Sequence, residues 1–303
     1  MSNQITQHMR RADWAILLIL SILWGGSFFF IEVLVEHLPP LTIVTLRVGL
    51  AAITLWLIIL ARKYEIPSTL KAWTALIIVG FLNNALPFTL ITWGQTHINS
   101  GLSSIFNATT PFFTVLVAGA LLADERVTQN KLLGVLIGIL GVSILIGLDA
   151  LKGITGSLFG QLAVLGAAIS YAFAGVFARR FKALGISPLM VATGQVTTAA
   201  FMLIPLTILI DKPWNLTLPP TPIIGAMLGL ALLSTVVAYI LYFRLIASAG
   251  ATNAALVTFI IPISAILLGV FILGETFTAT QALGMVLIGL GLIVMDGRLL
   301  KRR

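Results

Sequence analysis

One arginine stands in a stretch of sequence that offers it no water. Arg47 occurs in VTLRVGLA, inside an apolar run that continues to Leu60. Its guanidinium stays protonated in proteins and carries five N–H donors, so it needs acceptors or a counter-charge. Two roles fit: a clamp to Glu32 or Glu36 that holds helix ends together, or a fork that holds the carboxylate of a bound solute.

Amides and hydroxyls inside apolar runs form a second set of side chains that could bind a solute. Asn83 and Asn84 lie just before Pro87, which interrupts a helix and favours irregular backbone lining a cavity. Spacings of three and four predict a single polar helical face, made of Ser100, Ser103, Asn107, Thr110 and Thr114. Such hydroxyls also serve helix packing in membranes, so solute binding and packing both stay open as interpretations.

Aromatic side chains deep in the apolar runs form a third set. A buried Tyr or Trp needs a polar partner. An aromatic wall with scattered amides suits a zwitterion that has an apolar side chain, whereas core packing is the alternative for each residue. The predicted substrate-binding residues are therefore Trp24, Arg47, Asn83, Asn84, Phe88, Asn107, Tyr171 and Tyr239.

The sequence argues against several kinds of chemistry. All 10 acidic residues lie near the ends of apolar runs or between them, so strict proton exchange through a mid-membrane carboxylate is not expected. The sequence has no HExxH motif and no glycine-rich phosphate loop, and the absence of cysteine excludes disulfides and thiolate metal sites. We expect no catalytic residue, no metal and no cofactor. An intramembrane enzyme acting on lipid is the rival from another class.

Composition places these residues in a bilayer. The chain has 303 residues, of which 59% are hydrophobic and only 9% are charged, whereas soluble domains carry about 25% charged residues. The sequence predicts an all-α integral membrane protein, since helices satisfy their own backbone in lipid. Ten spans are expected: Trp14–Ile31, Leu41–Ala61, Ala72–Gly94, Gly101–Ala123, Leu132–Leu148, Ser157–Ala178, Pro188–Ile210, Pro222–Phe243, Ala251–Gly274 and Ala279–Met295.

The basic residues indicate the orientation of these spans. Fifteen of the 18 Lys and Arg residues fall on one side of a ten-span arrangement, Lys152 and Lys212 fall on the other, and Arg47 lies within a span. Basic loops stay in the cytoplasm, so both termini are expected there. The first apolar run lacks a small-residue cleavage site and is interpreted as a retained span. Although the net charge is +8, the basic residues form no patch for nucleic acid.

The chain repeats itself. The segment that begins PFFTVLVAGALLADE resembles the later segment PISAILLGVFILGE, and Arg47 aligns with Gln195. Each half holds five expected spans, and an odd number places the halves in opposite orientations, as in carriers with inverted repeats. Matching positions are Pro111 and Pro262, Glu125 and Glu275, Gly134 and Gly284, and Gly141 and Gly291.

The fifth span of each half carries glycines but no acid or base. Small residues let membrane helices approach closely, so both spans are interpreted as scaffold or as a subunit contact. A monomer is the simplest expectation for the assembly.

Two five-helix repeats that each end in Pro…(L/F)xx(D/G)E…G…G resemble the EamA-type repeat of the drug/metabolite transporter superfamily. WGGSFFF at Trp24–Phe30 and LRVGLAA at Leu46–Ala52 resemble its first two helices. The resemblance covers 13–148 and 155–296, and within the family the chain is similar to YddG-type exporters of aromatic and other amino acids.

The resemblance implies a multi-pass exporter in the bacterial inner membrane that moves small organic solutes, most of all amino acids, by alternating access. Its cavity would be walled by spans one, three, four, six, eight and nine, with spans two and seven beside them. A broad drug or metabolite exporter is the alternative.

Overall fold

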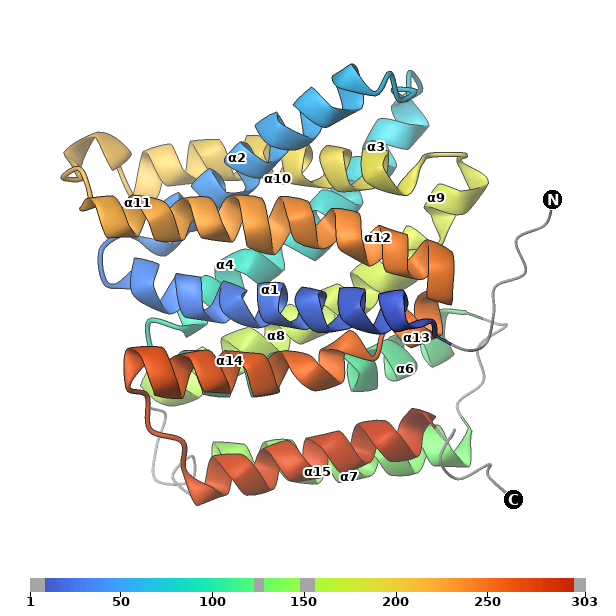
Figure 1. Cartoon of the computed structure of the whole chain (residues 1–303), viewed down its shortest axis with the longest axis vertical. Helices are drawn as coiled ribbons and strands as arrows, with labels where there is room; N and C mark the ends of the chain where they lie inside the picture. Colours follow the sequence, from blue (N-terminus) through green and yellow to red (C-terminus); the bar gives the residue numbers. More distant parts are fainter. Residues whose placement is uncertain (1–8, 123–127, 148–155, 297–303) are drawn as a thin grey trace.

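The computed structural model describes residues 9–122, 128–147 and 156–296. Over these ranges the chain forms helices and no strand. The long helices run side by side in alternating directions through a layered bundle (Figure 1). We call the end of the bundle at which α1 begins the N side. Several residues singled out in the sequence lie outside the described ranges, namely Glu125, Arg126, Lys152, Arg298, Lys301, Arg302 and Arg303.

The first half of the chain supplies the helices at two edges of the bundle and part of its middle. Its elements are α1 (Arg11–Val35), α2 (Pro40–Ala61), α3 (Leu70–Gly80), the π-helical segment η1 (Phe81–Ala85), α4 (Leu86–Gly94), α5 (Ser100–Asn107), α6 (Thr110–Leu121) and α7 (Gln129–Ile146).

The second half interleaves with the first. Its elements are α8 (Gly156–Ala178), α9 (Arg180–Ala183), α10 (Pro188–Ile210), the short 3₁₀ turn η3 (Pro213–Asn215), α11 (Thr221–Leu228), the π-helical segment η4 (Gly229–Val237), α12 (Ala238–Ala249), α13 (Ala251–Ala254), α14 (Val257–Leu273) and α15 (Ala279–Asp296).

Most of these helices have the length and hydropathy of membrane spans. Eight stretches of at least 18 residues qualify, and two shorter apolar helices, Val257–Leu273 and Ala279–Met295, accompany them. Four of the eight are composite, since α3 continues through η1 into α4, α5 is followed by α6, α8 is followed by α9, and α11 continues through η4 into α12. The chain is therefore a multi-span membrane protein.

The polar stripe expected in the fourth span is not one helical face. The helix stops after Asn107 and starts again at Thr110, so the stripe is divided between α5 and α6. Pro111 has no N–H to give the Asn107 carbonyl and would crowd it in a continuous helix. The Thr110 hydroxyl donates to that carbonyl instead, at 2.7 Å.

The interruption expected near Pro87 is confirmed. The segment η1 contains Asn83 and Asn84, and Pro87 opens the following helix α4. A π turn adds one residue to a helical turn and often marks a functional position. The second such segment, η4, contains no proline.

Helices α7 and α15 form a close pair at the edge of the bundle (Figure 1). A methyl group added at Gly134 would meet the Gly291 carbonyl, and one at Gly141 would meet the Gly284 carbonyl at 2.9 Å. These four glycines therefore let the two backbones touch within the chain. These glycines are used within the chain, and a subunit contact through another face of either helix stays a prediction.

Replacing Gly291 by Ala should lower the melting temperature of the purified protein. The new methyl group would press on the Gly134 carbonyl and on Phe112, and overpacking of this kind costs about 1–3 kcal/mol. Gly289→Ala is the control, because a methyl group there meets nothing within 4 Å. Equal melting temperatures for the two variants would contradict the glycine contact.

A candidate solute-binding site around Arg47

Arg47 turns into the bundle, as the cost of a lipid-facing charge demands. The residue is 5% exposed. Its Nε donates to the Thr235 hydroxyl at 3.0 Å, and its guanidinium carbon lies 3.7 Å from the centre of the Phe88 ring. The ring face attracts the cation and replaces part of its lost hydration.

No carboxylate among the described residues pairs with Arg47, so the expected clamp to Glu32 or Glu36 is wrong. Glu32 is bound elsewhere, since the Gln95 amide donates to it at 2.8 Å and also to the Phe28 carbonyl at 2.9 Å. The guanidinium thus lies buried with one hydrogen bond to its surroundings and no counter-ion from the described chain. Buried charges in proteins are usually paired, so the Arg47 guanidinium has donors left that could bind a further partner.

The local backbone explains why Thr235 can accept from Arg47. Its own hydroxyl proton goes to the Leu230 carbonyl, five residues earlier, at 3.0 Å. That spacing belongs to the π-helical turn of η4. With its proton engaged, the Thr235 oxygen presents a lone pair to the guanidinium.

Asn84 and Tyr239 form the second part of the site. Asn84 is fully buried, and its amide nitrogen donates to the Tyr239 hydroxyl at 2.9 Å. The amide oxygen of Asn84 is buried without a partner. Buried polar atoms rarely stay unsatisfied, so this acceptor is available to a donor on a ligand.

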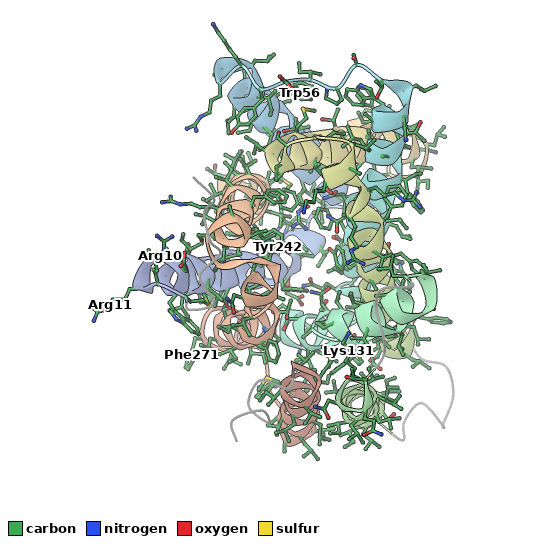
Figure 2. The ribbon with its side chains drawn as sticks, turned by 90° about the vertical axis from the view of Figure 1, so that its right-hand side faces the viewer. Arg10, Arg11, Trp56, Lys131, Tyr242 and Phe271 are labelled. Carbon is green, nitrogen blue, oxygen red and sulfur yellow. The ribbon has the colours of Figure 1, made fainter. Side chains whose placement is uncertain are left out.

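Three further aromatic residues, Tyr171, Trp24 and Tyr242, lie around this centre. The side chains of Tyr171 and Tyr239 are close enough to Arg47 to interact with it electrostatically. Trp24 packs against the hydrophobic cluster that contains Phe88, and its ring lies 5.2 Å from that of Tyr242. Viewed from the N side, Tyr242 lies near the middle of the bundle, whereas Trp56 and Phe271 lie towards its edges (Figure 2). We define the Arg47 cluster as Arg47, Asn84, Phe88, Tyr171, Thr235 and Tyr239.

Two predicted residues lie apart from the Arg47 cluster in their contacts. Asn83 donates to the Gln195 side chain at 3.1 Å, which ties η1 to α10. The Asn107 side-chain oxygen is buried and unpartnered at the end of α5. Within the described part of the chain, no hydrogen bond or ring contact links either one to the cluster.

Sequence reasoning missed Thr235. It does not stand out in its segment, because a hydroxyl in an apolar run is a common packing residue. The helices that contribute also differ from the expected set. The central side chain comes from α2, which the family resemblance placed beside the cavity.

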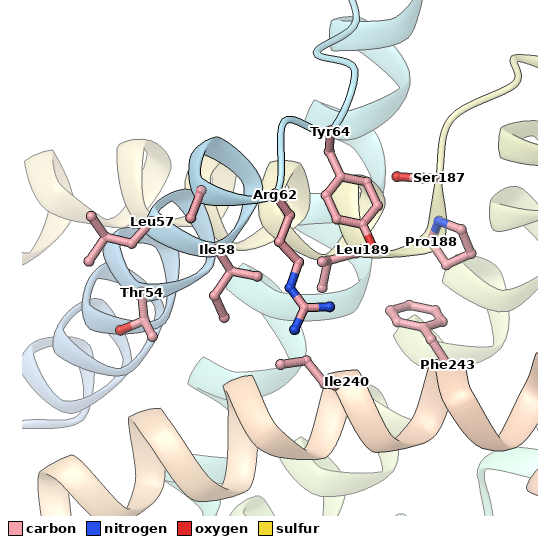
Figure 3. A pocket seen from close by; sticks show the side chains of 11 residues that line it. Thr54, Leu57, Ile58, Arg62, Tyr64, Ser187, Pro188, Leu189, Ile240 and Phe243 are labelled. Atoms are coloured by element: carbon pink, nitrogen blue, oxygen red, sulfur yellow. The ribbon is translucent and has the colours of Figure 1, made fainter.

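A cavity of about 560 Å³ opens near this cluster, towards the N side (Figure 3). It is connected to the cluster through Phe243, whose ring lies 6.3 Å from that of Tyr239. We call it the N-side groove. Its walls are formed by Thr54, Leu57, Ile58, Ala61, Arg62, Tyr64, Ser187, Pro188, Leu189, Ile240 and Phe243.

Comparison with protein families is decisive for the general class. A model described as "EamA-like transporter family" matches residues 13–147 and again residues 158–295. The chain belongs to the EamA-like transporter family. It is accordingly a transporter of the drug/metabolite transporter superfamily and not an enzyme.

Individual relatives agree with this class. The chain is 28% identical over 294 residues to a "Probable amino-acid metabolite efflux pump" of Escherichia coli, covering 94% of this chain and 95% of the relative. It is 26% identical over 285 residues to the "Uncharacterized inner membrane transporter YedA" of the same species, covering 92% and 89%. A solved structure titled "Crystal structure of protein" shares the fold, with a TM-score of 0.68, 19% identity and coverage of 97% and 100%.

The site is suited to holding a small polar solute within an EamA-type bundle. One cation, one free amide oxygen and several rings converge from α2, η1, α4, α8, η4 and α12. Such a set can bind and orient a solute.

Changing Tyr239 to Phe should destabilise the protein. The change removes the only hydrogen-bond acceptor that the described structure gives the buried Asn84 amide nitrogen, and an unsatisfied buried donor costs about 1–3 kcal/mol. Tyr242→Phe is the matched control on the same helix, because no hydrogen bond of its hydroxyl is found in the described structure. Thermal unfolding in detergent should separate the two variants. A larger loss for Tyr242→Phe would argue against the Asn84 contact.

Proposed function

We propose that this transporter exports amino acids, including aromatic and other apolar ones, and that Arg47 binds their carboxylate. The observation that carries the proposal is the buried guanidinium without a carboxylate partner among the described residues. A fork of N–H donors matches a carboxylate in geometry as well as in charge. A bound amino acid would complete the pairing that the protein leaves open.

The rest of the Arg47 cluster supports a zwitterion in particular. An α-ammonium group carries donors, and the unpaired Asn84 oxygen is an acceptor that lies one helical turn before Phe88, whose ring covers Arg47. The rings of Trp24, Phe88 and Tyr171 offer apolar surface for a side chain. The name of the Escherichia coli efflux pump supports the same class of solute at low identity.

Contacts between the halves support a ten-span, inverted-repeat arrangement with repeats at 13–148 and 155–296. In the repeat, Gly134 corresponds to Gly284 and Gly141 to Gly291. In the helix pair, Gly134 contacts Gly291 and Gly141 contacts Gly284. A pseudo-twofold axis in the membrane plane gives this reciprocal pattern. Secondary carriers with such repeats alternate access by exchanging the conformations of their halves.

The same pattern recurs at the site. Arg47 of α2 bonds to the π-helical segment η4, and its counterpart Gln195 of α10 bonds to the π-helical segment η1. The two interactions are equivalent in position but not in charge. In our proposal the solute therefore binds in one half of a nearly symmetric frame, on the side that carries the cation.

The charge distribution supports a cytoplasmic N side, in a bacterial inner membrane. Basic residues of the described chain gather there, including Arg10, Arg11 and Arg62, whereas Lys212 lies at the opposite end. Positively charged loops are retained in the cytoplasm during insertion. Export would then carry solute from the N side to the opposite side.

Labelling of single cysteines tests this orientation. Lys71 and Lys212 are both exposed and lie at opposite ends of the bundle, and the native chain has no cysteine to interfere. In intact cells, an impermeant thiol reagent should label Lys212→Cys and spare Lys71→Cys until the membrane is opened. The reverse result would invert the proposed topology.

Replacement of Arg47 by Gln tests the carboxylate site. Gln195 occupies the equivalent position in the other half, so the fold accepts this side chain there. Uptake of amino acids into proteoliposomes should fall at least about tenfold, since a hydrogen bond to a charged group contributes about 1.5–3 kcal/mol. Counterflow of the corresponding decarboxylated amines should change much less.

Two results would contradict the carboxylate role. Equal loss for amino acids and amines, together with a lower melting temperature, would make Arg47 a packing residue that holds α2 to η4. Equal and undiminished transport of both solutes by the variant would favour a broad metabolite exporter. Gln195→Ala is the control, because it alters the matched contact in the half that lacks the cation.

A further inference from the structure

The N-side groove exists because α2 and α12 diverge. One face of α2 carries Arg47, Thr54, Ile58 and Ala61, at intervals of seven, four and three residues that keep to one side of a helix. At Arg47 this face is closed against the second half by the hydrogen bond to Thr235. Towards the N side the same face lines the groove together with α12. The groove is thus the open end of a wedge whose closed end is the Arg47 cluster.

The walls of the groove are mostly apolar and partly turned towards the membrane. Leu57 is 64% exposed and Ile240 is 37% exposed, although both lie in spans of high hydropathy. Ile58, Leu189 and Phe243 complete the apolar surface (Figure 3). A ligand that fills this space therefore needs a hydrocarbon part, which a free inorganic anion lacks.

One positive charge enters the groove at its N-side end. The Arg62 side chain points inward between Ile58 and Leu189, and its guanidinium faces Ile240 (Figure 3). No carboxylate is among the residues that line the groove, and the described structure shows no hydrogen bond or ion pair of the Arg62 side chain. Tyr64 and Ser187, which carry hydroxyls, also line the groove. The guanidinium and the hydroxyls are donors of the kind from which a phosphate diester accepts hydrogen bonds.

We propose that the N-side groove binds an anionic phospholipid of the cytoplasmic leaflet. Its phosphate would pair with Arg62, and one acyl chain would lie along Leu57, Ile58 and Ile240. Basic pockets between helices on the cytoplasmic side of a membrane are suited to acidic headgroups. The assignment to that leaflet rests on the orientation given in the proposed function, whereas the binding chemistry does not.

The position of the lipid gives it a connection to transport. Its chain would touch Phe243, whose ring packs on Tyr239, and Tyr239 accepts a hydrogen bond from Asn84. The lipid would also occupy the space into which α2 and α12 would close. An occupied groove therefore stabilises the arrangement in which the wedge is open towards the N side.

Lipid retention by the full-length protein tests the proposal. Purified protein in detergent would be incubated with phosphatidylglycerol, and bound lipid would be measured by native mass spectrometry. Arg62→Gln should retain about fivefold less phosphatidylglycerol, the effect of losing one basic group beside an acidic headgroup. Retention of phosphatidylcholine, whose headgroup has no net charge, should be low for both proteins.

Two controls decide where the lipid binds. Arg244 is an exposed charge on α12, the helix that carries Ile240 and Phe243, but it does not line the groove. The Arg244→Gln variant should therefore retain phosphatidylglycerol as the wild type does. Ile240→Trp, checked for an unchanged elution profile, should lower retention by filling the groove while Arg62 is intact.

Three outcomes would overturn the proposal. Equal losses for Arg62→Gln and Arg244→Gln would indicate general attraction to a basic surface. Displacement of the lipid by millimolar inorganic phosphate would indicate a simple anion site. Unchanged retention in both Arg62→Gln and Ile240→Trp would place the lipid elsewhere. None of these results depends on the transported solute, so a failure here leaves the amino acid proposal standing.

Discussion

The hydrocarbon around this protein offers its backbone no hydrogen-bond partner, and this constraint shapes the structure. Regular helices satisfy every carbonyl and amide within themselves, and the chain departs from them at few places. Where it does, a local group fills the gap, as the Thr110 hydroxyl does for the Asn107 carbonyl. Two of these departures, η1 and η4, place Asn84 and Thr235 at the site. The two π-helical segments therefore supply two members of the Arg47 cluster.

Much of the fold could be predicted from sequence because membrane spans are long and strongly apolar. The inward direction of Arg47 also followed from the sequence, since a charge facing lipid is costly. The hydrogen-bond partner of Arg47 could not be predicted from the sequence. Thr235 is 188 residues away, and the π turn that prepares it to accept a hydrogen bond lies in GLALLSTVV, which contains no proline. In α5 and α6 the error was avoidable, because Pro111 already indicated that the polar stripe could not continue through one helix.

In the proposed inverted repeat, one scaffold would hold an asymmetric site. Arg47 contacts η4 and Gln195 contacts η1, so the two predicted repeats make corresponding contacts. A neutral amide in one place and a guanidinium in the other would then give the two halves different affinities for an anion. The Gln195 side-chain oxygen accepts a hydrogen bond from Asn83, whereas the arginine side retains unused donors. Chemical asymmetry would thus be added without a change in the backbone frame.

The glycine contact between α7 and α15 also has a consequence for biogenesis. Helix α7 enters the membrane midway through synthesis, but the surface that its glycines leave bare is covered only after α15 has been made. During that interval, lipid or the insertion machinery must occupy the exposed backbone face. A ribosome that stalls before α15 would leave a nascent chain whose α7 exposes its glycine face to the bilayer. Such an uncovered backbone surface is a feature that quality-control proteases can recognise. The pairing of α7 with α15 therefore forms only after translation has passed α15.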